Sequence, residues 1–142
     1  MKLRSEEPAK QTDEKAPWVE RETLIEASPG EVWEALTDED RLEEWLAPEV
    51  ELDPTEGGEI SVRDGDDERH GTVETVEEQE RFAFTWSRPG EGESFVEFTI
   101  EALPGSRVTV VETPIGPSAM AIGAWGSLLP RLQRSVCFTL VA

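Results

Sequence analysis

The spacing of apolar positions changes along the chain, and each spacing predicts a type of element. Between residues 59 and 113, apolar and polar residues alternate in short stretches, which is the period of a β-strand with one buried face. These stretches are EISVR, HGTVETV, RFAFTW, SFVEFTIEA and SRVTVVET, separated by turn pairs such as Asp64-Gly65, Pro89-Gly90 and Pro104-Gly105. WVERETLIEA (18–27) favours an earlier strand. Strands in direct succession favour an antiparallel meander.

The alternation also assigns side chains to the two faces of the predicted sheet. In RFAFTW, one face carries the aromatic residues and the other carries Arg81, Ala83 and Thr85. The residues expected on the apolar face are Phe82, Phe84, Trp86, Val96, Phe98, Ile100, Val108, Val110 and Glu112. The sheet should therefore have one apolar face and one solvated face.

Two short helices are predicted between the first strand and the others. Ser28, Pro29 and Glu31 form a helix start, with a capping residue, a proline at the first helical position and the acid of a capping box. Asp38 is expected to cap a second helix, which Pro48 ends. The residues expected on its apolar side are Leu42, Trp45 and Leu46. Trp33 should lie where the first of these helices meets the sheet, and Trp45 should point to a cavity mouth or to the core beneath it.

The C-terminal segment, residues 121–142, predicts a long helix. Its apolar residues recur at intervals of three and four, the spacing of a buried helical stripe, and are Ile122, Trp125, Leu129, Leu132 and Val136. Pro130 conflicts with an unbroken helix unless the regular helix starts near Gly126 or Ser127, or kinks at the proline. The order of elements predicts an α+β fold in which this helix lies across a curved antiparallel sheet.

Length, composition and charge limit the domain organisation and the partners that the chain could have. The 142 residues suit one domain, which we place at 18–142. Residues 1–17 have no apolar run, so we expect a disordered N-terminal tail and neither a signal peptide nor an anchor. The net charge of −19 disfavours nucleic acid and anionic membranes as partners. No stretch approaches the ~18 apolar residues of a membrane span, which favours a cytoplasmic protein.

Several sequence segments along the chain resemble those of a known family. They are IEASPGEVWEALTDEDRLEEWL, EGGEISV, HGTVETVEEQERFAFTW, RVTVVETP and AWGSLLPRL, in this order. From residue 18 to about 135 the chain resembles the START-like, or SRPBCC, helix-grip superfamily. The most similar branch contains bacterial proteins that resemble the C-terminal domain of the activator of heat-shock protein 90 ATPase. Co-chaperone activity in eukaryotic relatives also relies on a separate N-terminal domain, which the residues before Trp18 are too short to form.

This resemblance implies a cavity between the curved sheet and the C-terminal helix that binds a small, largely hydrophobic molecule. The residues expected to line it are Trp45, Phe84, Trp86, Phe98, Val110, Glu112, Trp125 and Leu129. Two alternatives remain open: a small enzyme of the cyclase or hydrolase type, and a chaperone-linked protein-interaction module. The enzyme would use Glu112 or His70 as a base.

Glu112 and His70 each have a second interpretation. The alternation places Glu112 on the apolar face, where it could orient a ligand, whereas an earlier end of its strand would let it reach solvent. Arg63 and Arg81 are conceivable partners for its carboxylate, although the alternation puts Arg81 on the outer face. His70 lies beside a charged hairpin, so it is either a base or a solvated residue.

The remaining chemistry predicts no cofactor and no metal. A single histidine cannot form a multi-histidine zinc site, and the aspartates of DGDD lack the spacing of a calcium loop. The single cysteine, Cys137, excludes an internal disulfide and is expected to be buried. Leu140 and Val141 must pack on their own sheet or meet a partner, and we expect a weak homodimer that uses this end.

Overall fold

The computed structural model describes residues 18–115 and 124–141, with side chains up to Val136. The elements are β1 (Val19–Ile25), α2 (Pro29–Thr37), α3 (Glu39–Trp45), β2 (Glu49–Leu52), β3 (Glu59–Asp64), β4 (Asp67–Glu77), β5 (Arg81–Ser87), β6 (Glu93–Leu103), β7 (Gly105–Ile115) and α4 (Trp125–Val141). The predictions for residues 1–17, and for the side chains of Cys137, Leu140 and Val141, fall outside this range. None of the helices in the described part is long and apolar enough to cross a bilayer.

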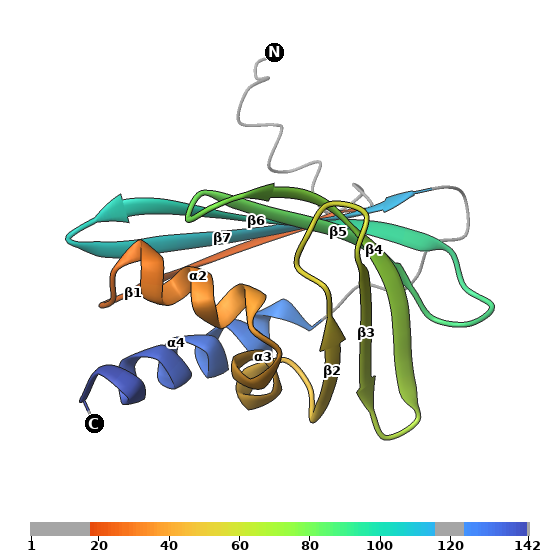
Figure 1. The fold of residues 1–142 in the computed structure, drawn as a ribbon, viewed down its shortest axis with the longest axis horizontal. Helices are drawn as coiled ribbons and strands as arrows, with labels where there is room; N and C mark the ends of the chain where they lie inside the picture. The colour runs from red at the N-terminus through yellow and green to blue at the C-terminus, as the bar shows by residue number, and fades with distance from the viewer. Residues whose placement is uncertain (1–17, 116–123, 142) are drawn as a thin grey trace, which may run out of the picture.

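The strands form one seven-stranded sheet in the order β1-β7-β6-β5-β4-β3-β2. Every pair of neighbours is antiparallel, and the first strand closes against the last, with Val19 opposite Glu112 and Ile25 opposite Ser106. The sheet curls so that β2, β3 and β4 turn toward the helices, while α2 and α4 lie beneath the rest (Figure 1). This confirms the α+β helix-grip fold that the sequence predicts.

The two short helices begin as their sequences predict. At the start of α2, the Ser28 hydroxyl accepts the Glu31 N–H at 3.2 Å, and the Glu31 carboxylate accepts the Ser28 N–H at 3.3 Å. Asp38 caps α3 by accepting the Arg41 N–H at 3.1 Å. Trp33 lies at the seam between α2 and the sheet, where its ring meets Phe82 edge-on at 6.1 Å. These caps set the residues at which the two helices begin.

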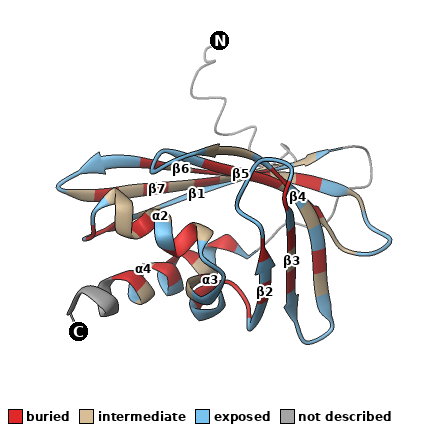
Figure 2. Ribbon diagram, in the orientation of Figure 1, coloured by how far each residue is buried: buried red, intermediate tan, exposed pale blue. Residues whose placement is uncertain are grey.

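The core lies between the concave face of the sheet and the helices (Figure 2). Every residue that the alternation assigns to the apolar face of β5, β6 and β7 is buried. So are the described members of the helical stripe, which are Trp125, Leu129, Leu132 and Val136. Ile122 falls outside the described residues. Buried positions could be predicted here because each strand and helix has one face toward the same core.

The C-terminal helix starts within one residue of the position that the sequence predicts. The helix begins at Trp125, ahead of Gly126 and Ser127, and continues through Pro130. Two N–H groups of its first turn, those of Ser127 and Leu128, donate to the carbonyl oxygen of Ala124 at 2.9 and 3.0 Å. Pro130 lies inside the helix, beyond its first turn, and because it has no N–H one backbone hydrogen bond of the helix is missing there. Trp125 lies on the buried face of the helix, as the helical spacing predicts.

Strand β2 was not predicted, because its four residues offer too short an alternation beside two prolines. It is an edge strand, and backbone groups on its open side are bonded by α3. The Val50 N–H donates to Glu43 at 3.1 Å, and the Leu52 N–H donates to Glu39 at 2.8 Å. The glutamates of α3 therefore cover an edge that could otherwise pair with another chain.

Candidate functional site

Glu112 lies on the inner face of β7, close to the end of the sheet beside the start of α4. Strand β7 continues to Ile115, so the strand does not end before Glu112, and the interpretation in which this side chain reaches solvent is wrong. The side chain is fully buried, with 0% of its surface exposed. A carboxylate in such a position requires hydrogen-bond donors around it.

Three side chains from three different elements donate to the Glu112 carboxylate. The indole N–H of Trp86, from β5, lies 2.7 Å from Oε2, and the indole N–H of Trp125, from α4, lies 2.8 Å from Oε1. The hydroxyl of Ser94, from β6, also donates to Oε2. The two indole rings stack with their centroids 5.8 Å apart and an interplanar angle of 13°. Glu112 thus fixes both indoles in one arrangement.

The cations that the sequence suggested for Glu112 are paired elsewhere. Arg63 forms an ion pair with Glu49 at 2.8 Å, and Arg81 forms one with Glu97 at 3.0 Å. These pairs keep both arginines at the surface, where their charges stay solvated. Neither conceivable partner therefore pairs with Glu112, and Arg81 lies on the outer face, as the alternation indicates.

A different arginine, Arg69, is buried near this cluster. Its guanidinium lies over the ring of Trp86, 4.6 Å from the ring centroid, which is a cation–π arrangement. Burial lowers the pKa of Arg69, while the nearby carboxylates of Asp67 and Glu112 act in the opposite direction. Trp86 therefore carries its N–H toward Glu112 and one ring face toward a cation.

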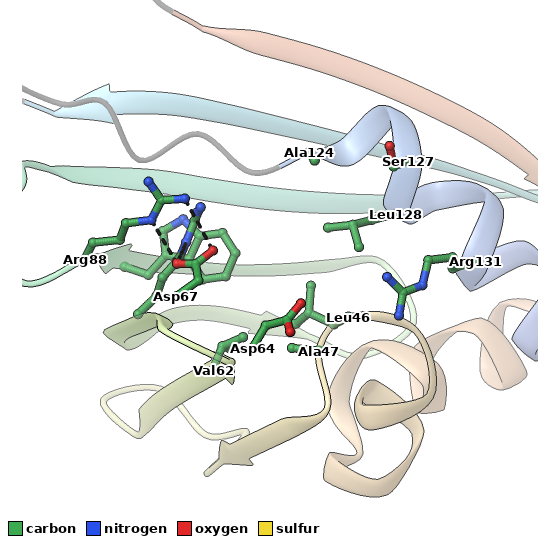
Figure 3. A pocket seen from close by; sticks show the side chains of 12 residues that line it. Leu46, Ala47, Val62, Asp64, Asp67, Arg88, Ala124, Ser127, Leu128 and Arg131 are labelled. Carbon is green, nitrogen blue, oxygen red and sulfur yellow. Dashed lines mark hydrogen bonds and ion pairs between the residues drawn. The ribbon is translucent and has the colours of Figure 1, made fainter.

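A pocket of about 290 Å³ opens beside Trp86, between the first turns of α4 and the ends of β3, β4 and β5 (Figure 3). Its apolar wall consists of Leu46, Ala47, Val62, Trp86, Ala124 and Leu128. Its polar wall consists of Ser127, Asp64, Asp67, Arg69, Arg88 and Arg131. This volume is at the small end of the range for ligand sites in proteins, so a compact molecule would fit.

The charged groups of the pocket fall into two sets. Arg88 binds Asp67 through two hydrogen bonds, of 2.9 and 3.3 Å, and Arg69 approaches the same carboxylate at 3.6 Å. The hydrogen bond from Arg88 holds the pKa of Asp67 below its ordinary value. Across the pocket, Arg131 and Asp64 form no ion pair with any residue in the described part of the chain. Figure 3 shows both side chains extending toward the space between them.

Of the residues predicted to line a cavity, Trp86 alone borders this pocket. The others are buried in the core, where their aromatic rings contact one another. Phe98 meets Trp125 at 5.5 Å and Trp45 at 6.3 Å, and Phe84 meets Trp86 at 5.2 Å. The remaining predicted residues are Val110, Glu112 and Leu129, which are buried as well. The Trp45 N–H donates to the Ala35 carbonyl at 2.9 Å, so this indole also points into the protein.

His70 lies apart from the pocket, on the opposite face of β4. Its side chain is 56% exposed, and its ring nitrogens lie 3.3 Å from the Ser61 hydroxyl and 3.0 Å from the Glu68 carboxylate. It does not approach Glu112, so the two candidate bases do not form one site. Within the described residues, no group of three or more histidine, cysteine or acidic side chains could hold a metal ion.

The sequence interpretation missed the arginines of the pocket. Arg69 lies beside the charged hairpin, yet it shares its strand parity with Gly71 and the buried Val73. That parity was a usable signal for an inward-facing arginine. Arg88 and Arg131 carry no such signal, because one follows the end of β5 and the other is on the exposed side of α4.

The sequence of the chain matches that of one known family over most of its length. The family described as Activator of Hsp90 ATPase homolog 1-like protein matches residues 26–136, from the capping box to the end of the buried helical stripe. The chain belongs to this family. No curated protein matches the chain in sequence.

Solved structures of other proteins share the fold of this chain. DynU16, a protein of the dynemicin biosynthetic locus, is 28% identical with a TM-score of 0.75 over 87% of the present chain. The chain spans about half of that relative, 48% of its length. MLL2253 from Mesorhizobium loti is 22% identical, with a TM-score of 0.77 and coverage of 86% and 98% of the two chains. The Aha1 dimer from Colwellia psychrerythraea is 17% identical, with a TM-score of 0.69 and coverage of 84% and 95%.

Proposed function

We propose that this chain binds a compact, largely apolar small molecule in the pocket beside Trp86. The observation that carries the proposal is the wall of the pocket. Apolar side chains from the end of α3, from β3 and β5 and from the start of α4 converge there, and charged groups flank them on two sides. Ligand sites in proteins usually combine an apolar wall with a small number of polar groups that orient the ligand. The proposed site lies between the sheet and the C-terminal helix, where the family resemblance implies a cavity.

The fold also supports binding more directly than catalysis. Glu112 is closed off by Trp86, Trp125 and Ser94, and it does not line the pocket. His70 is on the outer face of the sheet. DynU16 comes from a biosynthetic locus, which is consistent with a small molecule as the partner of a similar protein.

A titration followed by nuclear magnetic resonance tests the proposal. The probes are a panel of compact aromatic and alicyclic compounds, and the readout is the indole N–H signal of Trp86, assigned by its loss in Trp86→Phe. Because Trp86 borders the pocket, a ligand against its ring should shift this signal in a saturable way. The panel should contain at least one compound with a dissociation constant below about 1 mM.

Two matched variants locate the binding site. Ser127 lies at the exposed rim of the pocket, so Ser127→Trp should obstruct it and weaken binding at least tenfold. Ser61→Trp makes the same exchange on the outer face of β3 and should bind as the wild type does. If no compound produces saturable shifts, or if the two variants bind equally well, the pocket is not the ligand site and the proposal fails.

A further inference from the structure

We infer that the ligand of this pocket carries one acidic group, best matched by a carboxylate, which Arg131 binds. The inference rests on the proposed function and adds the chemical class of the ligand. The starting observation is that three arginines gather at one pocket of a very acidic protein. The chain has 13 basic residues and a net charge of −19, yet Arg69, Arg88 and Arg131 line the same pocket.

The ion pairs within the pocket distinguish these three arginines. Two hydrogen bonds of 2.9 and 3.3 Å tie Arg88 to Asp67. Arg69 lies against Trp86 and 3.6 Å from the same aspartate. Both guanidiniums are therefore committed to contacts inside the protein. Arg131 forms no ion pair with the residues that the structure describes, and its side chain extends toward the pocket (Figure 3).

The balance of charge favours a ligand with a single negative charge. Among the side chains that line the pocket, three arginines against the two aspartates Asp64 and Asp67 give a formal charge of +1. Glu112, behind Trp86, acts on Arg69 and Arg88 and reduces the positive potential further. One monoanion would neutralise this charge, whereas a dianionic phosphate would exceed it. The planar guanidinium of an arginine can donate two parallel hydrogen bonds to a carboxylate, which a point charge cannot do.

The net negative charge of the rest of the molecule disfavours the binding of anions, so a preference for an acid can be assigned to the residues of the pocket. A net charge of −19 repels any anion at long range, so a preference for an anionic ligand must come from local groups. Asp64 also lies on the wall of the pocket and disfavours a second negative charge. Arg131 and Asp64 should therefore affect the affinity for an acid in opposite directions.

The experiment compares 1-naphthoate with 1-naphthamide, two probes of nearly the same shape that differ in charge. Both are titrated by calorimetry and by the indole N–H signals against the wild type, Arg131→Gln and Arg134→Gln. Arg134 is a matched control, because it is an arginine on the same helix that does not line the pocket. Asp64→Asn serves as the variant that should change the affinity for an acid in the opposite direction.

The wild type should bind naphthoate more tightly than naphthamide. Arg131→Gln should weaken naphthoate about tenfold, the lower end for a hydrogen bond to a charged group because this site is open to solvent. The same change should alter naphthamide binding less than about twofold, and Arg134→Gln should alter neither probe by more. Asp64→Asn should tighten naphthoate.

Three results would overturn the inference, and they separate it from the proposed function. Equal binding of both probes with no effect of Arg131→Gln refutes the acidic ligand but leaves the proposed function standing. An equal loss of both probes in Arg131→Gln shows that Arg131 contributes only packing, with the same consequence. If neither probe binds saturably up to about 1 mM while another compound of the panel does, the acidic ligand alone is refuted, and if no compound of the panel binds, both are refuted.

Discussion

Replacing Glu112 by glutamine should destabilise the fold strongly, although the two side chains have nearly the same shape. The carboxylate accepts hydrogen bonds at both oxygens, from Trp86 and Ser94 at Oε2 and from Trp125 at Oε1. A glutamine has one oxygen and one NH2 group. If its oxygen takes the place of Oε2, its NH2 group faces the Trp125 N–H, and two donors then meet inside the core.

The magnitude follows from the bonds that change. The variant loses one charge-assisted hydrogen bond, worth about 1.5–3 kcal/mol, and leaves a buried donor unsatisfied at a further cost of about 1–3 kcal/mol. The lower cost of burying a neutral group offsets part of this loss. A net decrease of about 2–4 kcal/mol in the free energy of unfolding is expected, or about 8–16 °C in Tm for a chain of this size.

Urea unfolding followed by circular dichroism measures this change without relying on tryptophan fluorescence. Glu101→Gln is the matched control, because Glu101 pairs with Arg107 at the surface at 2.9 Å and its loss should cost less than about 1 kcal/mol. In a Trp125→Phe background the donor that glutamine cannot satisfy is absent, so the cost of Glu112→Gln should fall by about half. A Glu112→Gln variant as stable as the wild type, or more stable, would refute the reasoning.

Two further substitutions test the surroundings of the pocket. Gly71→Ala should destabilise the fold by about 3 kcal/mol, since its Cβ would overlap the Thr85 carbonyl oxygen. Gly126→Ala should cost nothing, because its Cβ would meet only the Arg21 side chain, at an ordinary contact distance of 3.9 Å. Equal urea midpoints for the two variants would contradict this. Asp67→Asn should lower stability at neutral pH, because Arg88 holds the pKa of Asp67 below its ordinary value and the ionised form is favoured in the folded state. Urea unfolding at several acidic pH values measures the difference in free energy of unfolding between the variant and the wild type. This difference should shrink as the pH falls below about 4 and through the lowered pKa of Asp67. A difference that grows over this range would contradict the reasoning.

The fold could be predicted from sequence because burial leaves a periodic signal. Phe82, Phe84 and Trp86 alternate with residues of the other face, and Trp125 and Leu129 repeat at helical spacing. Each pattern reports contact with the same core, so the strands and the closing helix could be assigned to two layers without knowledge of their partners. Strand β2 escaped because four residues are too few for alternation to be distinguished from chance.

The candidate site was harder to predict, because its polar contacts join residues that are distant in sequence. Alternation placed Glu112 on the apolar face, but it could not show which groups would satisfy the carboxylate. The donors are Trp86, Ser94 and Trp125, from three other elements, and their approach depends on the curl of the sheet. Arg131 is a further example, because an exposed arginine on a helix has the same local sequence signal whether or not a pocket lies beside it.

Trp86 connects the stability of the core to the chemistry of the pocket, and this determines which variants are informative. Its N–H donates to Glu112 at 2.7 Å, its ring stacks on Trp125, and it also lies under Arg69 and borders the pocket. A substitution of Trp86 removes several of these contacts at once, so weaker binding in that variant could arise from a loosened core or from a lost wall. Changes at Ser127 and Arg131 avoid this ambiguity, because both side chains are exposed at the rim of the pocket. Binding should therefore be tested with substitutions of Ser127 and Arg131, and stability with substitutions of Glu112.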